Sequence, residues 1–167
     1  IAANKNLLKP QDGQPISTPT QDIVLGCYWM TKEVEGAKGE GKMFSSPNEA
    51  IMAYDFGEVD FRAKVRVLPT ESLRYAEFNG QPFETTVGRL LFNTVLPKDY
   101  GYINHEVKKK DLSTVVKTTI DRYGVDVAAV ALDKIKDFGC KYVTMSGTTL
   151  SFEEVQVPEE KKDIIAA

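Results

Sequence analysis

A strict alternation of apolar and charged positions over residues 59–67 is the clearest pattern in the first half of the chain. A side-chain period of two predicts a β-strand with one buried and one solvated face, and Pro69 ends it. Residues 73–78 are predicted to be its antiparallel partner, followed by a turn at Asn79-Gly80. The apolar positions of the first strand are Val59, Phe61, Ala63, Val65 and Val67.

Two helices are predicted before this strand. Thr20 is expected to cap a helix over residues 21–31, with Asp22 favourably placed near the positive end of the helix dipole. Residues 46–49 read Ser-Pro-Asn-Glu, which is a capping box with proline at the first helical position. Gly57 stands where this second helix should end.

The second half of the chain has the period of helices. Thr85 or Thr86 is expected to cap a helix that Pro97 ends, and Pro158 is expected to open the last helix. The sequence therefore predicts an α+β fold. We expect a small antiparallel sheet region packed with helices, and a helix-rich C-terminal half.

The clearest amphipathic pattern lies between these helices. Asp111 is expected to cap a helix with a single apolar stripe, and Gly124 supplies the residue that ends it. A further helix is expected from Asp126 to about Tyr142. Gly139 lies inside that helix and costs about 1 kcal/mol relative to alanine. It is therefore either a point of close packing or an early stop.

Composition narrows the class of protein. The 167 residues are 42% hydrophobic and 27% charged, and no apolar run approaches the length of a membrane span, which excludes a transmembrane protein. The formal net charge of -3 argues against a surface built to bind phosphates. Two cysteines are too few for a disulfide scaffold and favour a reducing compartment.

The two ends of the chain suggest a segment of a longer protein. The first residue is Ile1 rather than methionine, and the last five residues read like the middle of a helix. We therefore expect residues 1–167 to be one excised segment, with a mixed sheet-and-helix part over 1–84 and a mainly helical part over 85–167. A trimmed tag or a maturation product is the alternative.

Two short motifs suggest nucleotide chemistry but lack its context. Residues 36–42 match the first seven positions of a phosphate-binding loop, yet Met43 stands where a magnesium-binding hydroxyl is required. A glycine-rich turn is the better interpretation. The tripeptide Asp-Phe-Gly occurs at 55–57 and at 137–139, without the other kinase motifs. Both copies are interpreted as helix positions next to a glycine.

The sulfur and imidazole groups do not form a recognisable site. His105 is the only histidine, and Cys27 and Cys140 are too far apart in sequence for the usual spacing of zinc ligands. A catalytic pair of Cys27 and His105 has no flanking signature, so Cys27 is expected to be a small buried apolar residue. The residues alone thus indicate no catalytic group and no metal site.

Four blocks of sequence, read in order, are more specific. They comprise residues 6–13 with 19–28, 37–41, 85–89 with 92–93 and 96–97, and 146–147 with 153–154 and 158–162. In these blocks the chain resembles the largest (beta-prime) subunit of bacterial DNA-directed RNA polymerase. The resemblance covers essentially the whole chain.

The resemblance implies a position within a catalytic assembly. In that family this stretch is the pore or funnel region (domain 3), between the aspartate loop that holds the catalytic magnesium and the bridge helix and trigger loop. It lines the secondary channel, through which nucleoside triphosphates enter and the backtracked RNA end is extruded. Transcript-cleavage factors and related proteins dock on its rim. The parent enzyme would add ribonucleotides to an RNA 3′ end by two-metal phosphoryl transfer.

The same resemblance implies what this chain itself contributes. The metal-binding aspartates lie outside it, so we expect no catalytic residue, metal or cofactor here and no activity alone. The implied partners are the rest of beta-prime and the other polymerase subunits, channel factors, transiently the triphosphates and the RNA end, and DNA through the whole complex. No membrane is implied, and the expected location is the cytoplasm.

Residues can be transferred only where the blocks match. Thr20, Gln21 and Asp22 fall in the family block nearest the active centre, and Gly88 and Arg89 fall in the block that opens the following helix. Arg89 has two interpretations. Its guanidinium could make bidentate contacts to a carboxylate or phosphate, or it could form a structural salt bridge.

Two other classes of function stay open from sequence alone. The chain could be a free-standing protein-interaction domain that shares this module, which the flanking reading frame would decide. It could also be a small enzyme that uses Cys27 or His105, which requires both side chains to be close together and exposed.

Overall fold

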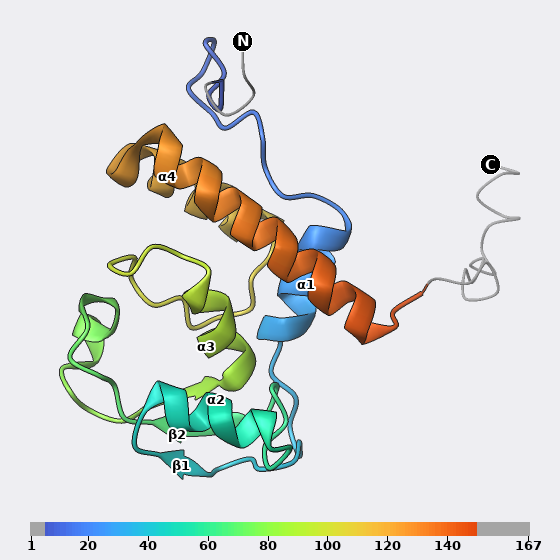
Figure 1. Ribbon diagram of the computed structural model, residues 1–167, viewed down its shortest axis with the longest axis vertical. Coiled ribbons are helices and arrows are strands. Elements are labelled where there is room, and N and C mark those ends of the chain that lie inside the picture. Colours follow the sequence, from blue (N-terminus) through green and yellow to red (C-terminus); the bar gives the residue numbers. More distant parts are fainter. Residues whose placement is uncertain (1–5, 150–167) are drawn as a thin grey trace, which may run out of the picture.

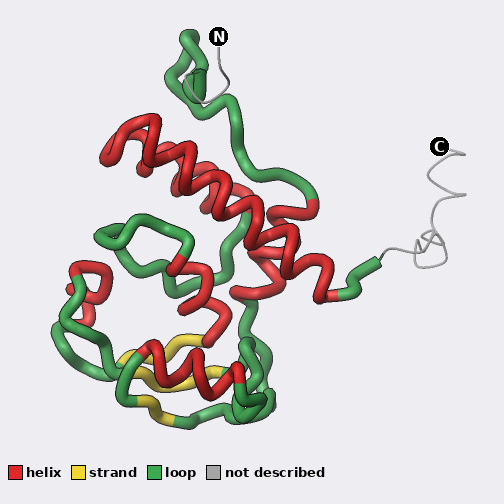
Figure 2. Tube along the Cα trace, viewed as in Figure 1, coloured by secondary structure: helices red, strands yellow, loops and turns green. Residues whose placement is uncertain are grey.

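A computed structural model describes residues 6–149, and it confirms the predicted α+β fold (Figure 1). The predicted helix from Pro158 lies outside the described residues. The strands and α2 gather at one end of the molecule, and α4 lies towards the other end (Figure 2). The elements in chain order are α1 (Asp22–Thr31), β1 (Met43–Phe44), α2 (Pro47–Asp55), β2 (Lys64–Val67), the 3₁₀ helix η2 (Leu73–Phe78), β3 (Phe83–Thr86), α3 (Val87–Thr94) and α4 (Lys109–Ser146).

The sheet has three strands in the order β1-β2-β3. β2 pairs with β1 in parallel, with Arg66 opposite Met43, and with β3 in antiparallel, with Val65 opposite Thr85. The sheet is therefore mixed rather than purely antiparallel. In Figure 1, α2 passes in front of the strands, so one face of the small sheet is covered by a helix.

The predicted strand over residues 59–67 is shorter than expected, because β2 begins only at Lys64. Asp60 bends the preceding chain: its carboxylate accepts a bond from Arg62 N–H at 2.8 Å, and its carbonyl accepts one from Ala63 N–H at 3.0 Å. Val59 is nonetheless only 2% exposed. The alternation thus identified the buried side chains correctly, while a side-chain turn replaced the first half of the strand.

The prediction that residues 73–78 pair with this strand is wrong. They form η2, and the partner of β2 is Phe83–Thr86 instead. The Phe78 ring stacks on Phe83 with centroids 3.9 Å apart, so the aromatic residues of this segment cover the sheet instead of extending it. The predicted turn is confirmed, since Asn79 takes the left-handed conformation with φ 47°.

Helix α2 follows its sequence signals closely. Ser46 is the N-cap, and its hydroxyl accepts a bond from Glu49 N–H at 3.2 Å. The Glu49 carboxylate accepts in return from Ser45 N–H at 2.6 Å, one residue before the position that a capping box predicts. Bonds from the hydroxyl and backbone of Ser45 lower the pKa of Glu49. The helix ends at Asp55, two residues before Gly57.

Helix α4 is a hairpin of two helical segments. Its backbone leaves helical geometry at Gly124, with φ 81° and ψ 173°, which confirms the predicted break. The two segments run back alongside each other in Figure 1, and Val116 and Ile120 of the first pack with Ala128 of the second. The hairpin begins at Lys109, so Asp111 is not its N-cap, although its carboxylate accepts a bond from Lys108 N–H at 2.8 Å.

Helix α1 lies between α3 and α4 and carries the centre of the core, with Cys27 and Met30 fully buried. Its contact with α4 is a backbone contact. A Cβ atom built on Gly26 would lie 2.0 Å from the carbonyl oxygen of Gly139. Of the two interpretations of Gly139, close packing is therefore correct.

Candidate functional site

The five residues predicted to lie near the functional channel fall into two groups at opposite ends of α1. Thr20, Gln21 and Asp22 are exposed at its N-terminal end. Gly88 and Arg89 are buried at the start of α3, against the C-terminal end of α1. Because ten helical residues span about 15 Å, the structure does not bring the two groups into one site.

The N-terminal group surrounds an unusual backbone geometry. Gln21 has φ 49° and ψ -121°, a conformation that residues other than glycine rarely adopt. Gln21, not Thr20, is the N-cap, and no side-chain hydrogen bond caps this end, so the prediction that Thr20 caps α1 is wrong. Asp22 does lie in the first turn as predicted. The start of α1 thus presents backbone N–H groups and one carboxylate to the surface.

Arg89 is a structural residue. Its Nε donates a hydrogen bond to the Thr31 carbonyl at 3.0 Å, and its Nη1 lies 3.7 Å from Glu33 Oε2. Nη1 also donates to Asn104 Oδ1 at 3.5 Å. The side chain is 10% exposed. Of its two interpretations, the structural salt bridge is therefore the one that the structure supports.

Gly88 lies at the contact between α3 and α1. A Cβ atom on this residue would lie 1.9 Å from the Met30 carbonyl oxygen, and its N–H donates to the Phe61 carbonyl at 2.7 Å. Thr86, just before it, caps α3 by accepting a bond from Arg89 N–H at 3.2 Å. Of the two predicted caps Thr86 is correct, while the Thr85 hydroxyl forms a hydrogen bond with the Tyr102 hydroxyl instead. The Thr-Val-Gly-Arg block therefore fixes how closely α3 approaches α1.

Two buried polar residues that sequence reasoning missed complete this junction. The Thr31 hydroxyl donates to the Cys27 carbonyl at 2.8 Å and accepts from Val107 N–H at 2.9 Å. The Asn93 amide nitrogen donates to Ile103 O, and Ile103 N–H donates back to Asn93 Oδ1, both at 2.9 Å. No local pattern could reveal these bonds, because Val107 lies 76 residues from Thr31.

An open depression of about 600 Å³ adjoins Arg89. His105 on its rim is 61% exposed, and its Nε2 lies 3.5 Å from Asp111 Oδ1. Its lining contains both acidic and basic side chains, so neither sign of charge is in large excess. Within residues 6–149, no group of three His, Cys, Asp or Glu side chains is arranged to hold a metal ion. The depression is lined by Glu33, Arg89, Asn104, His105, Glu106, Lys108 and Asp111.

The interpretation of Cys27 as a buried apolar residue is confirmed. The side chain is 0% exposed, and burial raises the pKa of its thiol to about 12, with a smaller contribution from Cys140. A thiol at that pKa is protonated at neutral pH and is a poor nucleophile. Because Cys27 is buried while His105 is exposed, the catalytic pair has no support.

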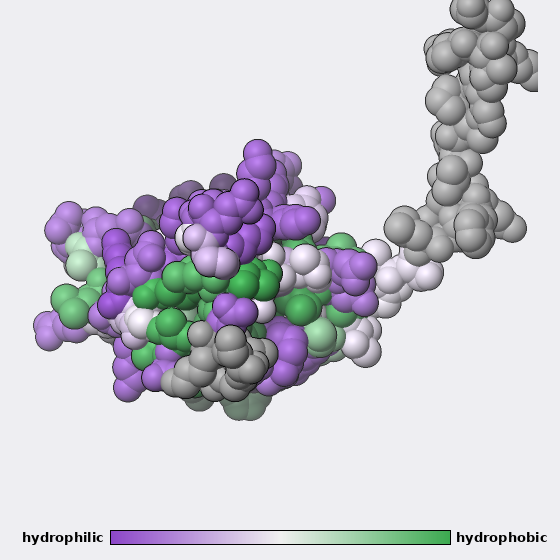
Figure 3. Space-filling view, turned by 90° about the horizontal axis from the view of Figure 1, so that it is seen from above, coloured by the Kyte–Doolittle hydropathy of each residue, from purple (hydrophilic) through white to green (hydrophobic). Residues whose placement is uncertain are grey.

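Apolar side chains are exposed on one face of the molecule, and α4 carries some of the exposed apolar residues. Figure 3, which looks onto the molecule from above, shows a hydrophobic band framed by hydrophilic side chains. Val130 and Met145 are the most exposed apolar residues of α4, at 55% and 58%. Contiguous apolar surface with a polar border is typical of a face that contacts another protein surface. Between residues 6 and 149, no helix is both long and apolar enough to cross a membrane.

Comparison with known proteins identifies the family. Residues 6–155 match the family described as RNA polymerase Rpb1, domain 3. The chain is 46% identical to the DNA-directed RNA polymerase subunit beta′ of Heliobacterium modesticaldum, with 96% of this chain and 14% of that protein aligned. It is 42% identical to the same subunit of a Nocardioides species, over 99% of the chain and 13% of that protein. With Acidothermus cellulolyticus beta′ the identity is 42%, over 100% of the chain and 14% of that protein.

The chain thus spans about one seventh of the length of the relatives it matches, and the resemblance seen in four blocks of sequence is confirmed from end to end. The chain belongs to the family of RNA polymerase Rpb1 domain 3, as found in bacterial beta′ subunits.

Proposed function

We propose that the chain works in transcription as a structural segment of the beta′ subunit of a DNA-directed RNA polymerase. The observation that carries this proposal is identity of 42–46% to three beta′ subunits over 96–100% of the chain. Nucleotidyl transfer belongs to the whole assembly. The chain itself supplies no catalytic group, and magnesium is held by parts of the subunit outside it.

Within that assembly, the chain forms part of the wall of the secondary channel. A wall must keep its shape while substrates and RNA pass, and the junction of α1 and α3 is suited to this. Its buried hydrogen bonds join Arg89 to Thr31 and Thr31 to Val107. Thr20, Gln21 and Asp22 are the exposed residues placed nearest the active centre, at the end of α1 away from this junction.

The remaining partners follow from the surfaces. The apolar face of α4 is suited to contact with the rest of beta′ or another subunit, since such surface is stabilised by burial. Channel-binding factors, triphosphates and the RNA 3′ end would meet the chain at the channel rim, and DNA only through the whole complex. The place of action is the bacterial cytoplasm.

Photo-crosslinking in assembled polymerase tests the channel position. A photo-reactive amino acid replaces Gln21 in the full-length beta′ subunit, and the RNA 3′ end carries a radioactive label. We expect labelling of beta′ in backtracked complexes, in which the RNA end enters the channel, and little in complexes whose RNA end occupies the active centre. The same replacement at Gln81, exposed in the turn after η2, is the matched control. Equal labelling at the two positions would contradict the channel assignment.

A further inference from the structure

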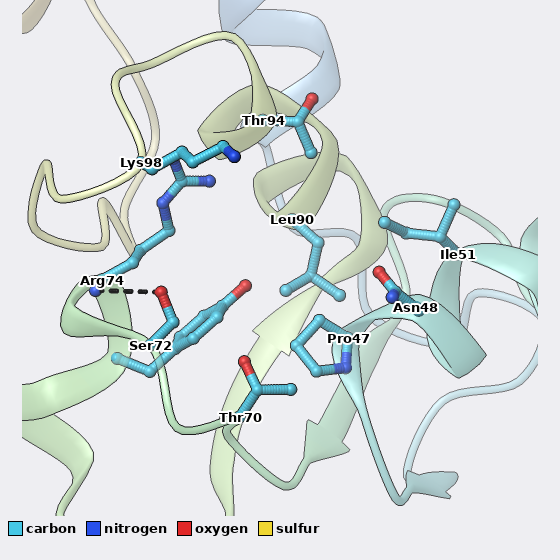
Figure 4. A pocket seen from close by; sticks show the side chains of 10 residues that line it. Pro47, Asn48, Ile51, Thr70, Ser72, Arg74, Leu90, Thr94 and Lys98 are labelled. Carbon is cyan, nitrogen blue, oxygen red and sulfur yellow. Dashed lines mark hydrogen bonds between the residues drawn. The ribbon is translucent and has the colours of Figure 1, made fainter.

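A second cavity, unrelated to the predicted channel residues, lies between α2, η2 and α3. Its volume is about 240 Å³. Figure 4 shows the Arg74 and Lys98 side chains at one end, with Leu90, Ile51 and Pro47 towards the other. The cavity therefore has a cationic end and an apolar end. Its lining consists of Pro47, Asn48, Ile51, Thr70, Ser72, Arg74, Tyr75, Leu90, Thr94 and Lys98.

The guanidinium of Arg74 is fixed in place by backbone carbonyls rather than by a close ion pair. Its Nη2 donates to the carbonyl oxygens of Leu96 at 3.1 Å and Pro97 at 2.8 Å. Its Nε is buried and has no hydrogen-bond partner in the part of the chain that the structure describes. Among the same residues, neither Arg74 nor Lys98 forms an ion pair with a carboxylate. Burial lowers the pKa of Arg74, because the cost of desolvation is only partly offset by nearby groups, the Asp99 carboxylate among them.

A guanidinium held by two neutral carbonyls, with an ammonium at the same end of the cavity, matches a doubly charged oxyanion. Arginine provides a fork of donors for phosphate oxygens, and lysine adds a point charge. Ser72 Oγ accepts a bond from Arg74 N–H at 3.4 Å, which leaves its own hydrogen available to a ligand. The side chains of Leu90 and Ile51 would contact an apolar group attached to that phosphate.

The volume limits the size of this group. A cavity of about 150 Å³ holds benzene, and drug-sized ligands need about 300–1,000 Å³. The observed 240 Å³ lies between these values. We propose that this cavity binds a small phosphate monoester with a compact apolar group, its phosphate at Arg74 and Lys98 and its apolar part against Leu90 and Ile51. This site is independent of the channel and of the proposed role in transcription.

Binding of 4-fluorophenyl phosphate to the full 167-residue chain, followed by fluorine NMR, tests the proposal. We expect saturable binding with a dissociation constant of about 1 mM, which is usual for so small a ligand. Lys98→Gln should weaken binding about fivefold, equivalent to about 1 kcal/mol. Arg74 and Lys98 also line a neighbouring cavity, which Lys134 borders, whereas Lys134 does not border this one. Lys134→Gln is therefore the control that separates the two cavities, and it should change the constant less than about twofold.

Two further measurements test the shape of the site. Thr70→Trp places a large ring at the exposed rim without changing charge, and it should abolish binding. Neutral 4-fluorobenzyl alcohol should not bind, and inorganic phosphate should compete only weakly. The proposal is overturned by an absence of saturable binding, by equal effects of Lys98→Gln and Lys134→Gln, or by inorganic phosphate binding as tightly as the aryl ester.

Discussion

Two regions of the molecule are packed in opposite ways: the crossing between α1 and α4, and the small sheet. At the crossing the two backbones touch, because Gly26 and Gly139 have no side chains to keep them apart. In the sheet, Val65 and Val67 are 0% exposed and fill the space beneath α2 and α3 with their methyl groups. An added side-chain atom would therefore clash at the crossing, whereas the loss of a methyl group would leave a cavity next to the sheet.

The sequence pattern identified the helices better than it identified the sheet. The helices α1, α2 and α3 and the break in α4 lie within a few residues of their predicted positions, because caps and glycines act locally. The sheet was less predictable. Its partner strand, Phe83–Thr86, runs directly into α3, because its last residue, Thr86, is the N-cap of that helix. Which apolar run pairs with β2 depends on tertiary packing, which local sequence does not encode.

The largest effect is expected from adding a methyl group at the crossing. Gly26→Ala should destabilise the chain by about 3 kcal/mol, because the new Cβ meets the Gly139 carbonyl and no rotamer can avoid it. Urea unfolding of the full chain measures the change. Gly101→Ala is the control, since nothing lies within 4 Å of a Cβ there, and its effect should stay near zero. An unchanged midpoint for Gly26→Ala would mean that the helices separate easily at this point.

The sheet should respond to the opposite change. Val65→Ala removes buried methyl groups in the middle of β2 and should cost about 2 kcal/mol through the cavity that it leaves. Arg66→Ala, on the exposed face of the same strand, should change stability by less than about 0.5 kcal/mol. Equal losses for the two variants would show that the two faces of β2 do not differ in packing.

A smaller effect is expected in the pH dependence of the free energy of unfolding. It tests whether water reaches the Cys27 thiol beside the crossing of α1 and α4. Below pH 9 the Cys27 thiol keeps its proton in both states, so it adds no pH dependence. Between pH 9 and about 12 the unfolded thiol ionises while the folded one does not, so stability falls as pH rises. The loss should reach about 1 kcal/mol at pH 10.

The measurement is the unfolding free energy against pH for the wild type, Cys27→Ala and Cys140→Ala. Cys27→Ala should lack this part of the slope, while Cys140→Ala should keep most of it, because desolvation is the larger cause of the shift. Identical slopes for the wild type and Cys27→Ala would place the thiol in contact with water.

The residues of the candidate site were selected from sequence, but their contacts were not predictable from it. The block around Gly88 and Arg89 was identified from sequence, yet only the structure assigns Arg89 to a buried bond with Thr31, 58 residues away. Thr20 was expected to cap α1, but the backbone of Gln21 turns with positive φ and the cap shifts by one residue. The cavity at Arg74 had no sequence signal, because η2 was predicted as a strand.

The sequence by itself determined the class of fold, the positions of most helices, the burial of Cys27 and the family to which the chain belongs. These follow from local periodicity, capping and runs of matching residues, all of which act over a few positions. Only the tertiary structure decided the sheet pairing, the role of Arg89 and the contact of Gly26 with Gly139. These depend on residues that lie far apart in sequence, and their energies arise only once the chain has brought them together.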